Sequence, residues 1–135
     1  MTMLDHETQP LEAWRDGVMT QMRVSALVRS AQLCIFEQYC DPGLGAPIHL
    51  HAVEEVLEVF EGEAEIIVAG ERYRAGPNKS VLIPAGVRHG FRNVGSGILK
   101  VRATLAAPIF EASYEDRNEL SRRYVPSFSA QAVKS

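Results

Sequence analysis

Three histidines and one glutamate are the residues of this chain whose types and spacing could bind a metal ion. His49 and His51 are two positions apart, so on a β-strand their side chains point to the same face. Glu55 has the same parity, and His89 follows 38 residues after His51. Imidazole suits iron, nickel, copper and zinc, and a carboxylate shifts the preference towards manganese. Together the four side chains predict a site for one divalent first-row metal ion.

A structural explanation competes with this one. His49 and His51, taken alone, could be two histidines that are hydrogen-bonded in a polar pocket. The matching spacing of Glu55 and His89 favours metal ligation instead. Glu54 is the competing carboxylate, but its parity is opposite to that of Glu55, so we expect Glu54 to face solvent.

Short strands with frequent turns must position these side chains. Runs rich in apolar and β-branched residues cover 32–39, 55–60 and 81–83, and the turn sequences at 41–43 and 95–97 separate such runs. Turns at intervals of about 8–12 residues are typical of a β-sandwich or barrel. The sequence therefore predicts an all-β fold, with a single domain over residues 1–135.

The spacing of these residues resembles that of the cupin family. The first cupin motif is glycine, five residues, His-x-His, three or four residues, glutamate, six residues and glycine. The second is glycine, five residues, Pro-x-Gly, two residues, histidine, three residues and asparagine. This chain meets nine of the ten fixed positions, at Gly43, His49, His51, Glu55, Gly62, Pro84, Gly86, His89 and Asn93. The departure is Asn78, in place of the first glycine of the second motif, and asparagine tolerates left-handed backbone angles.

The resemblance implies a jelly-roll β-barrel or sandwich with its motif core at 43–93. It also implies that the four residues bind one metal ion, which is iron, manganese, nickel, copper or zinc. Many small cupins form homodimers, and residues 14–23 are the expected region of exchange. The resemblance further implies a small-molecule ligand or substrate.

The two ends of the chain are expected to lie outside the β-strands of the barrel. Residues 1–13 and 130–135 are predicted to be loosely ordered. Ser113 is expected to cap a short C-terminal helix, with Asp116 at the capping-box position. That helix would cover the barrel mouth or pack on a partner subunit.

The net charge and the two cysteines indicate which binding partners and which cellular compartment to expect. The net charge is −3, from 14 basic and 17 acidic residues, so neither nucleic acid nor a membrane is expected as a partner. Cys34 and Cys40 would lie roughly 20 Å apart on one extended strand, whereas a disulfide needs Cα atoms within about 7 Å. Free thiols and the lack of a signal sequence favour the cytoplasm.

The predicted site has an apolar side. Phe91 shares the parity of His89, and Leu57 and Val59 share that of Glu55, so these three are expected to wall the metal cavity or to belong to the core. We expect a metal-dependent enzyme acting on a small organic molecule, with a dioxygenase favoured. The alternatives are a non-catalytic binding protein and a metal-dependent isomerase, lyase or decarboxylase.

Overall fold

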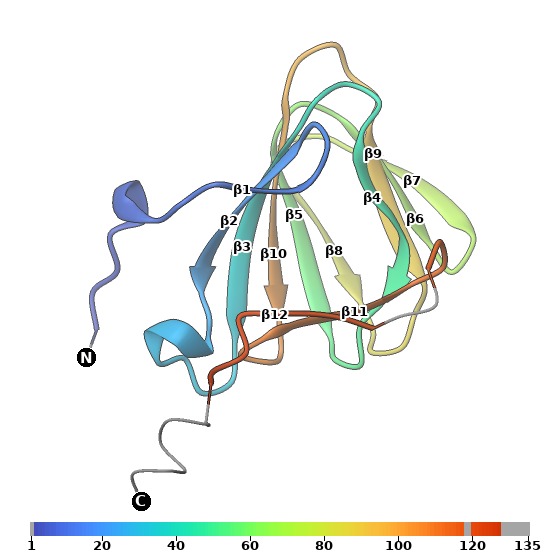
Figure 1. The fold of residues 1–135 in the computed structure, drawn as a ribbon. Helices are drawn as coiled ribbons and strands as arrows, with labels where there is room; N and C mark the ends of the chain where they lie inside the picture. Colours follow the sequence, from blue (N-terminus) through green and yellow to red (C-terminus); the bar gives the residue numbers. More distant parts are fainter. Residues whose placement is uncertain (1, 118–119, 128–135) are drawn as a thin grey trace, which may run out of the picture.

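The computed structural model describes residues 2–117 and 120–127, which form two six-stranded antiparallel sheets that face each other (Figure 1). The first sheet contains, in order, β1 (Glu12–Arg15), β2 (Val18–Val24), β3 (Cys34–Cys40), β10 (Leu99–Leu105), β5 (Glu55–Glu61) and β8 (Lys79–Ile83). The second contains β12 (Leu120–Arg123), β11 (Phe110–Tyr114), β4 (Gly45–Leu50), β9 (His89–Asn93), β6 (Ala64–Val68) and β7 (Glu71–Ala75). The predicted all-β sandwich is confirmed.

The helical content is limited to two single turns in the described part of the chain. These are the 3-10 turns η1 (His6–Thr8) and η2 (Ala26–Val28). Within the described residues, no helix has both the length and the apolar character that crossing a membrane requires.

The core lies between the two sheets, and alternation along the strands fills it. In β10, Leu99, Val101, Ala103 and Leu105 are all buried, while the residues between them are partly exposed. Val101 and Ala103 lie opposite Val59 and Leu57 of β5, so β10 and β5 direct the same parity inward. Burying one such leucine contributes about 2 kcal/mol to folding. These inward-facing side chains form part of the hydrophobic core between the two sheets.

The predicted C-terminal helix is wrong, because β11 and β12 pair with each other as the two antiparallel strands of a hairpin. Phe110 pairs with Arg123, and Ser113 pairs with Leu120, so Ser113 lies within a strand and caps no helix. The alternation explains this outcome: Phe110 and Ala112 are buried, whereas Ser113 is exposed, which is the period of a strand. The hairpin extends the second sheet beyond β4. The predicted tail at 130–135 lies outside the described residues.

The N-terminal segment lies beside β2 and is held there by hydrogen bonds. The Gln21 amide donates to the His6 carbonyl at 2.6 Å, and the Gln9 amide donates to the Arg23 carbonyl at 2.9 Å. After this segment, β1 pairs with β2 of the same chain and forms one edge of the first sheet.

Cys34 and Cys40 are the first and last residues of β3, are fully buried and are both free thiols. The prediction that they do not bridge each other is therefore confirmed. Burial raises the pKa of each thiol to about 12, so both stay protonated at neutral pH.

The turn before β8 uses the left-handed conformation at Asn78, whose φ is +68°. We expect Asn78→Gly to leave the free energy of unfolding unchanged or slightly raised, because glycine adopts this φ freely. Asn78→Val should cost about 1–2 kcal/mol, because a β-branched residue is strained there. Urea unfolding measures both, with Lys79→Val on the neighbouring strand position as the control. Equal stability of the glycine and valine variants would contradict this account.

Candidate metal centre

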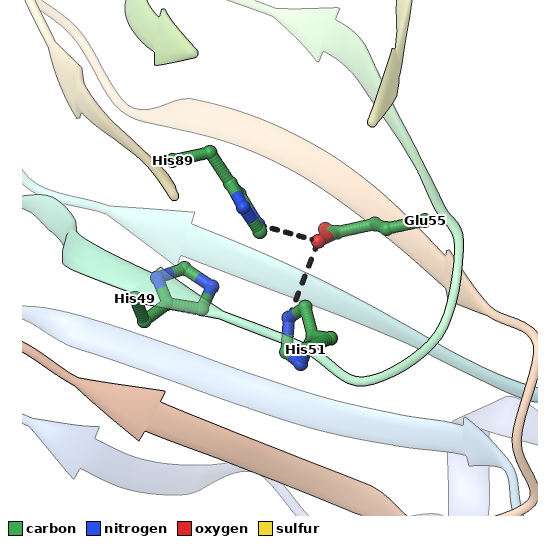
Figure 2. A group of neighbouring side chains, drawn as sticks. All are labelled: His49, His51, Glu55 and His89. Carbon is green, nitrogen blue, oxygen red and sulfur yellow. Dashed lines mark hydrogen bonds and ion pairs between the residues drawn. The ribbon is translucent and has the colours of Figure 1, made fainter. Parts of the chain in front are cut away.

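The structure brings the four predicted ligands together inside the sandwich (Figure 2). His49 lies in β4, His51 just after it, Glu55 at the start of β5 and His89 at the start of β9. Their four ligand atoms lie within 4.8 Å of one another, and all four residues are buried. Two ligands at about 2.1 Å from a common ion are at most about 4.2 Å apart, so little adjustment is needed. Glu54 is exposed, as its parity predicts.

One turn and one close approach of strands position the histidines of the centre. The backbone N–H of Gly86 donates to the His51 carbonyl at 2.8 Å, and Gly86 has a φ of +77°. This contact joins the turn before β9 to the segment after β4. On β9, a Cβ atom at Gly90 would lie 2.8 Å from the Ala46 carbonyl, so only glycine lets β9 approach β4 beside His89.

Backbone carbonyls fix the orientation of all three imidazoles. The Nδ1 atoms of His49, His51 and His89 lie 2.7–2.9 Å from the carbonyl oxygens of three other residues, Pro47, Glu111 and Val87 respectively. A carbonyl only accepts hydrogen bonds, so each Nδ1 carries the proton and donates. Each Nε2 is then directed to the centre, in the tautomer that a metal ligand requires.

Glu55 links two of the histidines through one oxygen. Its Oε1 lies 2.7 Å from Nε2 of His89 and 3.2 Å from Nε2 of His51. Burial would raise the pKa of Glu55, but the hydrogen bonds and charges of these two histidines outweigh it and lower that pKa to about 2. The carboxylate is therefore ionised at neutral pH and supplies the negative charge that a divalent ion needs at this buried position.

The surroundings shift the pKa values of His49 and His89 in opposite directions. Burial lowers the pKa of His49 to about 4, and the neighbouring histidines add to this effect. Burial would also lower the pKa of His89, but the hydrogen bond and charge of Glu55 raise it overall. His49 is thus neutral at pH 7, whereas Glu55 favours a proton on Nε2 of His89. A metal ion would displace that proton.

Metal affinity should therefore depend on pH. As the pH falls below the raised pKa of His89, its proton competes with the metal, and apparent affinity should drop about tenfold per pH unit for each proton displaced. Competition titrations of zinc against a chromophoric chelator, from about pH 8 to about pH 6, measure this change. An affinity that stays constant over this range after correction for the chelator would contradict the assignment of His89.

A small cavity of about 20 Å³ adjoins the four residues. Of the predicted wall, Leu57 and Phe91 line it, whereas Val59 is buried in the core and is not among the lining residues. Gln38 and Tyr114 provide the polar groups of the wall besides the cluster itself. Strand parity directs Gln38 inward with the other even positions of β3. Tyr114 was missed because its segment was predicted to be helical.

Comparison with known proteins agrees with this architecture. No curated protein matches the sequence. Among solved structures, an RmlC-like cupin from Shewanella frigidimarina is 23% identical, with a TM-score of 0.67, over 83% of this chain and 91% of that one. Oxalate decarboxylase from Lactobacillus farciminis is 15% identical, with a TM-score of 0.74, over 82% of this chain and 34% of the other. Salicylate 1,2-dioxygenase from Pseudoaminobacter salicylatoxidans is 17% identical, with a TM-score of 0.63, over 76% of this chain and 28% of that one.

These structural likenesses concern the fold alone, since the three proteins carry out different reactions or have none in their names. The family model described as "Cupin domain" matches residues 36–106, which is more than half of the chain and contains every residue of the candidate centre. The chain belongs to the cupin family.

Proposed function

We propose that this chain binds one divalent metal ion (iron, manganese, nickel, copper or zinc) through His49, His51, Glu55 and His89. The observation that carries this proposal is the convergence of three Nε2 atoms and one carboxylate, each imidazole being oriented by a backbone carbonyl. Four protein ligands leave about two positions of an octahedral shell open. A bound ion would supply Lewis acidity, an activated water or a point of attachment for substrate.

We further propose a metal-dependent enzyme that acts on a small organic molecule, with a dioxygenase favoured. The apolar side chains of Leu57 and Phe91 shield the cavity from water and suit a partly apolar substrate. Tyr114 supplies a titratable group beside the centre, with its ring 5.2 Å from that of His49. Burial raises its pKa, an effect that outweighs the nearby Arg15 charge, so the phenol keeps its proton and can act as an acid.

A second candidate is a non-catalytic binding protein. The cavity of about 20 Å³ beside the centre holds little more than one water molecule, and this favours ion binding without a substrate. A metal-dependent isomerase, lyase or decarboxylase shares the same ligand set. These candidates differ from a dioxygenase in their use of oxygen.

Oxygen consumption distinguishes these candidates. The protein is loaded separately with each of the five metals under anaerobic conditions and then mixed with oxygen and a panel of phenols and small carboxylic acids. A dioxygenase should consume about one oxygen per molecule of product. Product without oxygen uptake would place the protein among the isomerases, lyases or decarboxylases. Binding of a panel member without any product would favour the non-catalytic candidate.

We also propose a cytoplasmic homodimer, with no nucleic acid or membrane partner. Strand β1 forms one edge of the first sheet and could add a strand from a second copy, which would place residues 14 and 15 of the expected 14–23 region at the interface. Multi-angle light scattering should give twice the mass of one chain. A single-chain mass across the micromolar range would overturn the dimer.

A further inference from the structure

The cavity beside the candidate centre is so small that a molecule inside it lies close to all the groups that line it. Its volume of about 20 Å³ is room for about one water molecule. The four candidate ligands form one part of the lining, and the other lining side chains among the described residues are apolar except Gln38 and Tyr114. Besides the candidate ligands, only these two polar side chains are available to a molecule in the cavity.

Gln38 is a buried amide that the described chain leaves mostly without hydrogen-bond partners. It is 8% exposed and lies on β3 directly opposite the fully buried Thr20 of β2. Nε2 of Gln38 donates to Oγ1 of Thr20 at 3.0 Å, the one side-chain hydrogen bond that Gln38 forms within residues 2–117 and 120–127. An amide has two N–H donors and an acceptor oxygen, so one donor and the oxygen remain for another partner.

The surroundings of Gln38 indicate that this partner occupies the cavity. Apart from Glu55, Gln38 is the only polar side chain with which the first sheet lines the cavity. The other first-sheet side chains in the lining are Phe36, Leu57 and Ala103. An amide without partners among apolar side chains would cost about 1–3 kcal/mol, and buried polar atoms are nearly always paired. A molecule bound in the cavity would satisfy the amide.

We infer that Gln38 is a specificity-determining residue of the proposed metal centre, because its amide hydrogen-bonds the molecule that occupies the cavity beside the four ligands. The volume and the wall define the class of that molecule: about one or two non-hydrogen atoms, at least one of which forms hydrogen bonds, as in water or fluoride. Thr20 is a positioning residue, which acts through Gln38. The inference rests on the proposed function for the metal, but a water held by Gln38 does not require the metal.

The first test measures fluoride binding to protein loaded with copper(II), one of the five proposed ions. Fluoride is a single atom that accepts hydrogen bonds, and its binding to copper changes the electron paramagnetic resonance spectrum. Gln38→Met keeps the length of the side chain but removes the amide, so it should weaken fluoride binding about tenfold. Thr20→Val should weaken it less, because the amide remains but loses its support. Copper affinity should change little in both variants, since neither residue is among the four candidate ligands.

Gln21→Met is the matched control for loss of a buried amide. Gln21 lies next to Thr20 on β2 and is 7% exposed, but its amide donates to the carbonyls of His6 and Gln9 on the N-terminal segment. This variant should lower stability and leave fluoride binding unchanged. Acetate, which is larger than the cavity allows, should leave the spectrum of the wild type unchanged. Thermal unfolding of each variant checks that it folds.

The second test needs no metal. A high-resolution crystal structure of the metal-free protein should show one water in the cavity within hydrogen-bonding distance of the Gln38 amide. The Gln38→Met structure should lack this water. Gln38 also lines a neighbouring cavity of about 20 Å³, beside Trp14. A water that meets the amide only in that neighbouring cavity would overturn the inference.

Unchanged fluoride binding in Gln38→Met would also overturn it, as would an equal loss in Gln21→Met or acetate binding as tight as that of fluoride. The two proposals can fail separately. Copper uptake with fluoride binding that does not depend on Gln38 would reject the role of Gln38 alone. A water held by Gln38 in the metal cavity of a protein that takes up none of the five ions would support that role and reject the metal centre.

Discussion

Replacing Glu55 by glutamine is expected to weaken metal binding by about 100-fold or more. The carboxylate of Glu55 lies between His51 and His89 and is the only acidic member of the four-residue group. Glutamine keeps the shape of the side chain but removes the negative charge that compensates a divalent ion in this buried site. Competition against a chromophoric chelator at neutral pH measures the affinity.

The neighbouring residue provides the control for this experiment. Glu54→Gln removes the same charge one position earlier in the chain, on a side chain that is exposed. Screening by solvent should limit its effect on affinity to less than about threefold. Similar losses in the two variants would mean that overall charge governs metal uptake, and Glu55 would then not be a ligand.

Replacing Glu37 by glutamine is expected to lower the free energy of unfolding by about 2–3 kcal/mol. Glu37 is fully buried although it lies on the outer face of the first sheet. Arg102 donates to Glu37 Oε2 at 2.6 and 3.0 Å, and Tyr39 donates to Oε1 at 2.8 Å. Arg23 and Lys100 add ion pairs at 3.0 and 3.8 Å. The glutamine variant would leave three cations without their shared anion.

The stability that Glu37 contributes should depend on pH. Burial would raise the pKa of Glu37, but the hydrogen bonds from Arg102 and Tyr39 and the nearby positive charges lower it overall. A carboxyl with a depressed pKa stabilises the fold above its unfolded pKa of about 4.3 and loses that contribution as the pH falls through its folded pKa. The difference between wild type and Glu37→Gln should therefore be largest at neutral pH and shrink below about pH 4.

Urea unfolding at several pH values measures this difference. Glu111→Gln serves as the control, because Glu111 forms an exposed ion pair with Arg122 and should change stability by less than about 1 kcal/mol. A Glu37→Gln variant as stable as the Glu111→Gln variant at neutral pH would contradict the role assigned to the buried cluster.

The candidate centre could be predicted from the sequence because the spacing of its residues follows the two cupin motifs. Parity alone explains only part of it: His49 and His51 are two positions apart, but the chain bends at 52–53 and Glu55 begins β5 in the opposite sheet. The turn at Pro84 and Gly86 signals where His89 begins its strand. The left-handed position at Asn78 could also be predicted, since few residue types adopt that conformation.

Contacts between distant segments could not be predicted in this way. The carbonyl that orients His51 belongs to Glu111, 60 residues away, and backbone carbonyls have no sequence signature. The segment after Phe110 contains both a capping pattern and a strand alternation, and pairing with β4 decides for the strand. Glu37 is buried on the outer face of the first sheet because arginines and a lysine from two other strands converge on it, and the sequence does not signal that convergence.

The central claim, one metal ion held by these four residues, is tested most directly by elemental analysis of the protein purified without a tag or added metal. The same analysis is made on the variant with both His49→Ala and His89→Ala. We expect about one iron, manganese, nickel, copper or zinc per chain in the wild type and none in the variant. A wild type that carries no metal and takes up none of the five ions on reconstitution would contradict the account.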